Sequence, residues 1–482
     1  MNIKVAKQEI ANSVKAYLAK NEKGQYYIPT NRQRPILMIG APGIGKTAIM
    51  EQVAKENKVA LVSYTITHHT RNSAIGMPQI VDMHFDREAF SVTKYTMSEI
   101  IASIYRKMNA TNLKEGILFL DEINCVDESL APQMLQFLQC KTFGNFKVPD
   151  GWVIVVAGNP KEYNSSVREF DIATLDRMKK MEVEPDFSVW LEYAWQARVH
   201  SIILSYLYNN QGNFFKILIT PEEKNFVTAR AWEDLSDMLK AYEHLGYDIT
   251  RDLIKEYVQD DVIAEDFVKY YHAVKGVRDS VFGENDVEMA YKTMQSTHEE
   301  YMKYAIVFDK IHQLAEVVYN CEYERYFAKN VLGMTNDIMD IYRRNMTDFR
   351  YDTYSVAETK RQKVTIAEET NFMSDNEMAA MKNAIKFVDD IGIKHAHGMD
   401  EAIYANEIQE NVTKEFEHIL PNYEKVLLDT RVAINEAWDF AKRVMDEDAM
   451  ALFEREMASN YHITNFEKWA GEPLMDCEIA AC

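Results

Sequence analysis

The chain has 482 residues, of which 47% are hydrophobic, and its formal net charge is −21 at pH 7. A chain of this length can form two to four domains, and its longest apolar runs, such as residues 152–157, are far shorter than the ~18 residues of a membrane-spanning helix. The sequence therefore excludes a transmembrane helix, and its five scattered cysteines, none in a C-x-x-C pair, predict a reduced, cytoplasmic protein without structural zinc.

Charge is unevenly distributed along the chain. Residues 1–240 carry 28 basic and 27 acidic side chains, whereas residues 241–482 carry 26 basic and 48 acidic ones. Because affinity for nucleic acid depends on neutralising phosphates with Lys and Arg, the second half would repel DNA or RNA. We expect a protein partner with a basic face instead, although acidity by itself also keeps a chain in solution.

Residues 1–30 begin the chain with an amphipathic helical pattern. Lysines occur throughout MNIKVAKQEIANSVKAYLAK, so this segment lacks the uninterrupted apolar core of a signal peptide. We expect an N-terminal helix here, followed by an α/β core over residues 31–185, where short apolar strands alternate with helical stretches.

An apolar strand at residues 36–39 runs directly into a glycine-rich loop and then into the helix-forming segment 48–56. The loop fits the pattern G-x-x-x-x-G-K-[ST], in which backbone N–H groups converge on phosphate oxygens at a helix N-terminus. This pattern predicts that Lys46 contacts the β- and γ-phosphates of ATP and that the Thr47 hydroxyl binds Mg²⁺. The residues expected around the nucleotide are Gly40, Ala41, Pro42, Gly43, Ile44, Gly45, Lys46, Thr47 and Ala48.

The next strand, residues 60–65, leads into His68 and His69. Adjacent residues at a strand end point to opposite sides, and no cysteine or acidic residue lies near them in the sequence. We therefore expect these histidines not to bind zinc, which prefers four converging ligands.

Two β-hairpins are expected within the core. In residues 78–96, apolar and polar residues alternate on both sides of a turn at residues 86–88. Residues 141–152 form the second hairpin, which turns at Gly144-Asn145. Thr96 and Glu99 have the T-x-x-E spacing of a capping box, which predicts that a helix begins there.

Residues 116–120 form an apolar strand that ends in two carboxylates, Asp121 and Glu122. A strand buried on both faces presents its C-terminal end to the ligand crevice, so Asp121 is expected to bind Mg²⁺ and Glu122 to deprotonate an attacking water. Two acids at this point could instead begin a helix and stabilise its dipole.

A second buried strand, residues 153–157, is followed by Asn159. If the two strands are neighbours, Asn159 lies level with Asp121, where an amide can position the water without adding charge. A last strand at residues 178–183 completes the predicted sheet.

After this strand, helical patterns replace strand patterns. Residues 241–482 contain seven glycines and two prolines, so long helices meet few breakers. Ser374 and Glu377 form a second capping box, and apolar residues recur behind it at helical spacing, which is typical of a packed core. We expect a helical lid at residues 186–275 and an all-helical domain at residues 276–482.

This order of motifs resembles that of the AAA+ ATPases, and more narrowly of their MoxR-like branch. The glycine-rich loop resembles Walker A, the strand ending at Asp121 and Glu122 resembles Walker B, and Asn159 resembles sensor 1. Both hairpins resemble insertions characteristic of that branch, the second being its pre-sensor 1 hairpin. The resemblance covers residues 30–275 and implies a P-loop core, with a parallel sheet between helices, and a helical lid.

The resemblance also implies two arginines that respond to the nucleotide. Arg177, in a segment similar to the family's LDR element, is expected to project into the site of a neighbouring subunit. Arg168 also follows Asn159 and is a rival for this role. Arg230 resembles the sensor 2 arginine of the lid, although the family commonly has proline where this chain has Ala229. Each arginine could instead form surface ion pairs.

The resemblance implies an ATPase that works as a homo-oligomer, a hexameric ring, because a neighbouring chain completes each pocket through Arg177. The family's partner is often a von Willebrand factor A protein, and loops near His68 and His69 would line the central pore. Three alternatives stay open: a monomeric P-loop phosphotransferase, a nucleic-acid motor related to the MCM helicases, and a ring that binds ATP without turnover.

Overall fold

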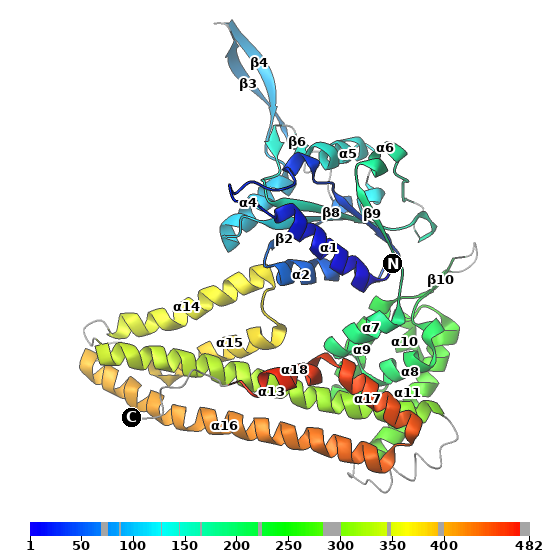
Figure 1. Ribbon diagram of the computed structural model, residues 1–482, viewed down its shortest axis with the longest axis vertical. Coiled ribbons are helices and arrows are strands. Elements are labelled where there is room, and N and C mark those ends of the chain that lie inside the picture. The colour runs from blue at the N-terminus through cyan, green and yellow to red at the C-terminus, as the bar shows by residue number, and fades with distance from the viewer. Residues whose placement is uncertain are drawn as a thin grey trace. The chain divides into compact units, whose positions relative to one another are not determined.

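The computed structural model describes residues 1–68, 76–85, 88–126, 128–143, 145–163, 166–219, 224–282, 300–344, 349–393 and 400–472. It divides into two compact units (Figure 1). The first comprises Met1–Val189 with Glu368–Phe372, and the second comprises Trp190–Ala367 with Met373–Cys482. The first unit contains a sheet between helices, whereas the second consists almost entirely of helices.

The first unit is built on a five-stranded parallel sheet. Its strands are β1 (Ile36–Gly40), β2 (Ala60–Thr65), β5 (Gly116–Asp121), β8 (Trp152–Gly158) and β9 (Lys179–Val183), in the spatial order β2-β5-β8-β1-β9. Strand β8 is buried along its whole length, as expected for a strand covered on both faces. The predicted α/β fold is confirmed, and each predicted strand lies within one residue of its expected bounds.

Helices cover both faces of this sheet. They are α1 (Ile3–Leu18), α2 (Lys46–Asn57), α4 (Glu99–Thr111), α5 (Ala131–Cys140) and the short α6 (Ile172–Asp176). Alternate strand residues such as Leu118 and Ile154 form one core cluster with Ile104 of α4 and Phe137 of α5. Because alternate residues of a strand point to opposite faces, α4 and α5 cover one face. The buried residues of α2 lie outside this cluster, so α2, with α1 against it, covers the other.

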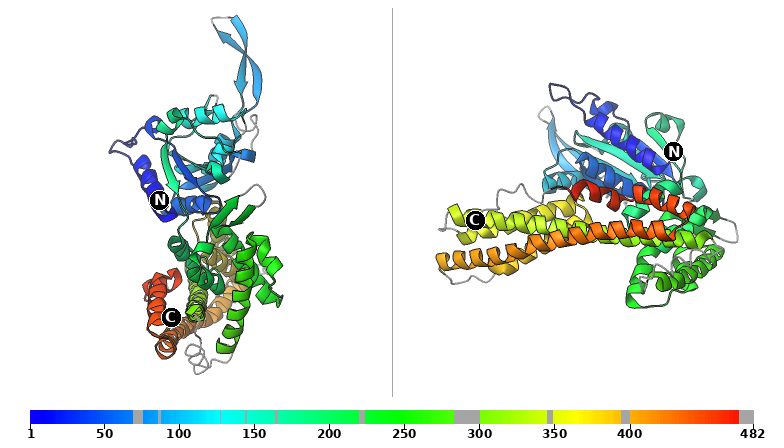
Figure 2. Two further views of the ribbon diagram at one scale, coloured as in Figure 1. Left: turned by 90° about the vertical axis from the view of Figure 1, so that its right-hand side faces the viewer. Right: turned by 60° about the horizontal axis from the view of Figure 1, so that its bottom comes forward.

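Two hairpins accompany the sheet. Strands β3 (Pro78–Phe85) and β4 (Glu88–Tyr95) form a two-stranded ribbon that extends away from the sheet (Figures 1 and 2), and β6 (Thr142–Phe143) pairs with β7 (Phe146–Lys147). Most of the described side chains of the ribbon are exposed. The ribbon therefore gains little stability from the core of this unit.

The predicted capping box at Thr96 and Glu99 is wrong. Helix α4 begins at Glu99 with Ser98 at its N-cap position. Thr96 instead closes the base of the ribbon, because its hydroxyl accepts the N–H of Met77 at 2.8 Å and its own N–H donates to the Met77 carbonyl at 2.9 Å. The Thr96 side chain therefore bonds to the ribbon and not to the N-terminus of α4, where the sequence spacing had placed it.

The second unit is mainly helical. Its first part contains most of α7 (Phe187–Gln196), α8 (Ser201–Asn209), strands β10 (Lys216–Ile219) and β11 (Lys224–Val227), α9 (Ala229–Leu245), α10 (Arg251–Tyr257) and α11 (Asp261–Phe282). The rest contains α13 (Glu300–Arg344), most of α14 (Phe349–Thr370), α15 (Asp375–Val388), α16 (Glu401–Val444), α17 (Glu447–Ser459) and α18 (Tyr461–Trp469). Among the described residues, no helix is both long and apolar enough to cross a membrane.

Several features of this unit differ from the sequence-based expectations. The β10–β11 hairpin was not predicted, because its four-residue strands are too short to show an alternating pattern. Helix α11 runs through residue 275, where the lid was expected to end. Helix α16 continues through Pro421, although proline usually breaks or kinks a helix interior.

The second predicted capping box is present. The Ser374 hydroxyl accepts the N–H of Glu377 at 3.2 Å at the start of α15. Behind it, Met381, Ile385 and Val388 are buried in one cluster with residues of α13 and α16. These helices lie alongside one another (Figures 1 and 2) and form the predicted helical bundle.

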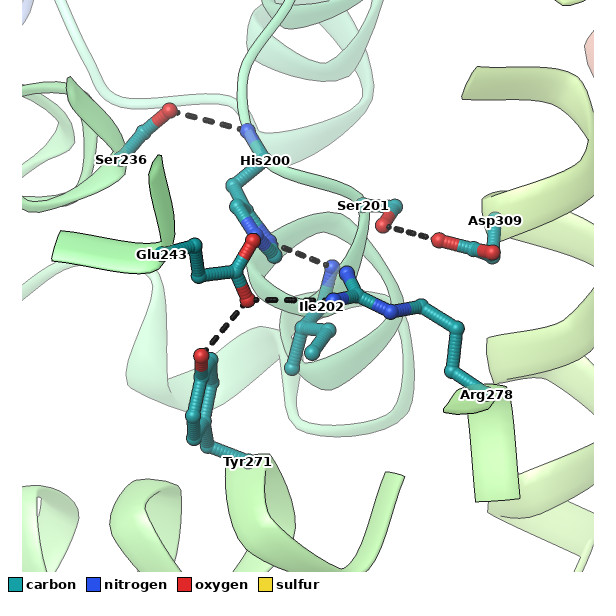
Figure 3. Close-up of polar contacts among 8 residues, drawn as sticks. All are labelled: His200, Ser201, Ile202, Ser236, Glu243, Tyr271, Arg278 and Asp309. Carbon is teal, nitrogen blue, oxygen red and sulfur yellow. Dashed lines mark hydrogen bonds and ion pairs between the residues drawn. The ribbon is translucent and has the colours of Figure 1, made fainter. Parts of the chain in front are cut away.

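A cluster of charged and polar residues lies inside the second unit (Figure 3). The Glu243 carboxylate accepts hydrogen bonds from the Tyr271 hydroxyl at 2.6 Å and from Arg278 at 3.3 Å, and Nε2 of His200 lies 3.2 Å from its other oxygen. Desolvation raises the pKa of Glu243, but His200, Tyr271 and Arg278 outweigh it and lower that pKa to about 2.

The Glu243→Gln variant is expected to lose stability above pH 5 and to be less sensitive to acid. Because the pKa of Glu243 is lower in the folded than in the unfolded chain, its carboxylate stabilises the fold above the unfolded value of 4.5 and this contribution disappears as the pH falls towards 2. At pH 7 the free energy of unfolding of the variant is expected to be lower than that of the parent by on the order of 3 kcal/mol, and urea unfolding measures this difference.

The matched control is Glu265→Gln, which breaks partly exposed pairs with Lys269 at 3.0 Å and with Arg251 at 3.1 Å. Exposed pairs contribute little to stability, so this variant is expected to unfold like the parent. The same dependence of unfolding free energy on pH in the parent and Glu243→Gln would contradict the assignment.

Candidate functional site

The glycine-rich loop connects β1 to α2. Gly43 and Gly45 have φ angles of 72° and 90°, in the left-handed region that glycine adopts without strain. A side chain at Gly40 would come within 2.8 Å of the Val183 carbonyl oxygen in the adjacent strand. The loop therefore needs glycine at these positions to pass from the buried strand into the helix, whose N-terminus faces the expected phosphate position.

Lys46, the first residue of α2, is held at the end of the sheet. Its side chain is almost completely buried, and its ammonium group donates to the carbonyl oxygens of Gly40 at 2.9 Å and Ala41 at 2.8 Å. It also donates to Oδ1 of Asn159 at 2.9 Å. Lys46 and Asn159, which are 113 positions apart in the chain, thus meet at one point.

Thr47 and Asp121 are brought together beside this lysine. The Thr47 hydroxyl donates to one Asp121 carboxylate oxygen at 3.0 Å, and the other oxygen accepts the backbone N–H of Glu122 at 2.9 Å. Hydroxyl and carboxylate oxygens are the hard ligands that Mg²⁺ prefers. These two residues therefore fit the role of a magnesium pair next to the phosphate loop.

Glu122 turns away from the direction of β5. Its backbone is left-handed, with φ 57° and ψ 32°, and its carboxylate accepts the Thr67 hydroxyl at 2.7 Å. A non-glycine residue with positive φ is uncommon and costs about 1 kcal/mol or more. This conformation sends the Glu122 carboxylate towards the segment after β2, so that Asp121 and Glu122 occupy separate positions although they are adjacent in the chain.

Asn159 is positioned by a residue that the sequence did not single out. The side-chain amide of Asn124 donates to the Asn159 carbonyl at 2.7 Å, and its oxygen accepts the Asn159 N–H at 3.3 Å. A Cβ at Gly158 would approach this Asn124 oxygen to 2.5 Å, so Gly158 leaves the space that Asn124 fills. Thr67 was also missed, and neither residue belongs to a spacing pattern that could have revealed it.

The Asn124→Ala variant is expected to lose roughly 1–3 kcal/mol of stability, because it leaves two backbone groups of Asn159 without their partner inside the protein. ATP turnover should fall as well, since Asn159 is no longer held level with the end of β5. Urea unfolding and phosphate release measure the two effects. An Asn124→Asp variant keeps the acceptor but cannot donate, and it should lie between parent and alanine variant. Unchanged values in both variants would contradict this positioning role.

The three predicted arginines occupy different places. Arg177 follows α6, is exposed, and donates to the Ala173 carbonyl at 2.8 Å. Arg168 forms an ion pair with Glu128 at 2.7 Å. Arg230 is exposed in the first turn of α9, in the second compact unit. The structure thus brings Lys46, Thr47, Asp121, Glu122 and Asn159 together within the first unit, and Arg230 is not part of that unit.

The start of α9 is fixed without the proline that the family commonly has. Thr228 occupies the N-cap position, and its side chain accepts the N–H of Ala231 at 3.3 Å. This cap sets the beginning of the helix at Ala229. Arg230 is therefore held in the first turn of a defined helix.

The two histidines after β2 were expected not to bind zinc. His68 ends a 3-10 turn that begins at Ile66, and His69 lies outside the described residues. Across the part of the chain that the structure describes, no group of three or more His, Cys, Asp or Glu side chains could hold a metal ion.

Residues 36–179 match the family model described as "ATPase family associated with various cellular activities (AAA)". The chain contains an AAA domain. Its matched span begins at β1 and ends at the first residue of β9, so it includes the phosphate loop, Asp121, Glu122 and Asn159. The description of this family names ATPases.

Other comparisons add less. One solved structure that resembles the chain is titled "Structure of C. elegans PCH-2". It is 15% identical, with a TM-score of 0.25, over 45% of this chain and 50% of that chain. The comparison with curated proteins gave no match.

Proposed function

We propose that the chain is a MoxR-like AAA+ ATPase that hydrolyses ATP in a homo-oligomeric, hexameric ring and uses the energy to remodel or activate a protein partner. The observation that carries this proposal is the convergence of Lys46, Thr47, Asp121, Glu122 and Asn159 at one end of the parallel sheet. A phosphate loop beside a carboxylate pair and an amide contains the parts that phosphoryl transfer to water requires.

Each residue has a defined role in this proposal. The Lys46 ammonium group neutralises phosphate oxygens, and Glu122 takes the proton of the attacking water. Asn159 orients that water through its side-chain amide. Thr47 and Asp121 would hold Mg²⁺, which neutralises negative charge on the phosphates when bound.

Arg177 is proposed to complete the pocket of a neighbouring chain. It is exposed at the end of α6 and makes no ion pair that would compete with this role among the contacts found for the described residues. Arg168, by contrast, is paired with Glu128. This difference favours Arg177 over Arg168, while Arg230 is proposed to report the state of the γ-phosphate to the helical lid.

Assignment to the MoxR-like branch is supported by the two hairpins. The β3–β4 ribbon precedes α4, and the β6–β7 hairpin precedes β8, which are the positions expected from the resemblance. A protein partner, for which a von Willebrand factor A protein is the family's example, is supported by the acidic composition of residues 241–482, which disfavours nucleic acid.

The proposal is tested by measuring ATP turnover per chain over a wide range of protein concentration. A pocket that needs two chains loses specific activity on dilution, in step with dissociation of the ring in light scattering. A monomeric phosphotransferase keeps a constant specific activity, and a ring without turnover releases no phosphate. Lys46→Ala serves as the variant without nucleotide binding. Saturable, salt-sensitive DNA binding by the parent would favour the nucleic-acid motor instead.

A further inference from the structure

The cluster around Glu243 crosses the boundary that the sequence suggested between lid and C-terminal domain. His200, Glu243 and Tyr271 lie before residue 275, whereas Arg278 lies after it (Figure 3). Tyr271 and Arg278 both lie in α11, which continues past residue 275. Glu243 therefore fixes α9 against α11 and against the start of α8, and a movement among these helices would leave the carboxylate with fewer partners inside the protein.

A second carboxylate ties α8 to α13. The Ser201 hydroxyl donates to one oxygen of Asp309 at 2.9 Å, and Gln313 donates to the other oxygen at 2.9 Å. Asp309 is only 5% exposed, so water cannot easily replace these donors. Helices α8 and α13 are consequently held in one relative position.

His200 links two helices through both of its ring nitrogens. Its Nδ1 accepts the backbone N–H of Ile202 at 3.2 Å, which leaves the ring hydrogen on Nε2, facing Glu243. Its own backbone N–H donates to the Ser236 hydroxyl at 2.9 Å. His200 thus caps α8 and contacts α9 twice, and a rotation between these helices would break the two contacts with α9.

Two further contacts extend this connection along α13 and to α17. Arg198 donates to both carboxylate oxygens of Glu316 in α13, at 3.2 and 3.0 Å. The indole N–H of Trp195 donates to Glu456 of α17 at 2.9 Å, and both side chains of this bond are buried. The first helices of the second unit are therefore bonded to the long helices at several independent points.

We infer that the lid, residues 190–275, and the arm, made of α13 (Glu300–Arg344), α15 (Asp375–Val388) and α16 (Glu401–Val444), form one rigid lever. The source of its motion rests on the proposed function, in which ATP moves the lid. Helix α13 has 45 residues and spans roughly 65 Å at ~1.5 Å per residue. A lid rotation of about 10° would carry the far end of such an arm through roughly 10 Å, which transmits the motion to a protein partner.

The inference is tested by the distance between two spin labels, one on the lid and one on the arm. Asp237 of α9 and Asp340 of α13 are exposed and can be replaced by labelled cysteine after Cys140, Cys477 and Cys482 are changed to serine. Pulsed electron–electron double resonance is expected to give one narrow distribution of label-to-label distances. The mean distance should differ by no more than about 2 Å between the ADP state and the ATP state. A shift above about 5 Å would overturn the inference.

A variant carrying Asp309→Ala and Glu316→Ala removes both carboxylates of α13 that bond to the lid. Its lid-to-arm distribution is expected to become about twice as broad, because the helices lose the bonds that fix their positions. Should that chain not fold, Ser201→Ala with Glu316→Gln makes a milder change to the same contacts and should broaden the distribution less. Glu265→Gln, which breaks exposed pairs within the lid, is the matched control and should keep the narrow distribution. Equally narrow distributions in all variants would refute the connection.

The labels separate this inference from the proposed function. A narrow distribution in a chain that does not hydrolyse ATP supports the rigid connection and refutes the ATPase. Hydrolysis in a chain whose lid-to-arm distance varies with nucleotide refutes the lever and leaves the ATPase intact.

Discussion

Replacing Glu122 by glutamine is expected to lower ATP turnover by roughly 10²- to 10⁴-fold and to leave ATP binding unchanged. Glutamine has the size of glutamate and keeps an oxygen that can accept the Thr67 hydroxyl, so the local structure should persist. It cannot take a proton from water at neutral pH. Phosphate release measures turnover, and the fluorescence of a labelled ATP analogue measures binding.

The matched control is Glu162→Gln. Glu162 is an exposed carboxylate in the 3-10 turn after β8. Its removal should leave turnover within about twofold of the parent. If Glu122→Gln showed the same small effect, Glu122 would not be the general base and another group would have to accept the proton.

Replacing Arg177 by alanine is expected to reduce turnover by roughly 10³- to 10⁵-fold, because an arginine supplied in trans stabilises charge on the transferring phosphoryl group. ATP binding should persist, since the Lys46 side of the pocket is unchanged. Mixing the Arg177→Ala chain with the Glu122→Gln chain should restore part of the activity. In the mixed ring, an intact Glu122 of one chain can meet an intact Arg177 of the next.

Arg168→Ala is the comparison that assigns the trans-acting role. Arg168 is engaged with Glu128, so its loss should have a much smaller effect on turnover. A larger loss with Arg168→Ala than with Arg177→Ala would exchange the two roles. If the mixed chains assembled into rings but recovered no activity, Arg177 of one chain would not act together with Glu122 of the next.

The sheet could be predicted because its signals are local. Strands β5 and β8 are continuous apolar runs, and the phosphate loop follows β1 without a polar residue between them. Parallel strands with crossover helices then place Asp121 and Asn159 at the same edge. The contacts of Lys46 with Asn159 and of Thr47 with Asp121 follow from this topology.

The remaining features depend on contacts between distant residues. Asn124 and Thr67 act through hydrogen bonds to backbone or carboxylate groups that no spacing rule connects to them. The Thr96 hydroxyl could accept a hydrogen bond from the start of α4 or from Met77, and the sequence could not show that it bonds to Met77. The Glu243 cluster joins α9, α11 and the N-cap of α8, which are far apart in the sequence, so its members looked like ordinary polar residues on amphipathic faces.

The close approach of Gly158 to the Asn124 side chain limits which residues can occupy these two positions. A methyl group at position 158 would overlap the Asn124 amide oxygen, at 2.5 Å. Any larger residue at 158 therefore needs a shorter one at 124, and the shorter residue gives up the two bonds that seat Asn159. In homologous sequences, we expect positions 124 and 158 to covary or both to stay unchanged.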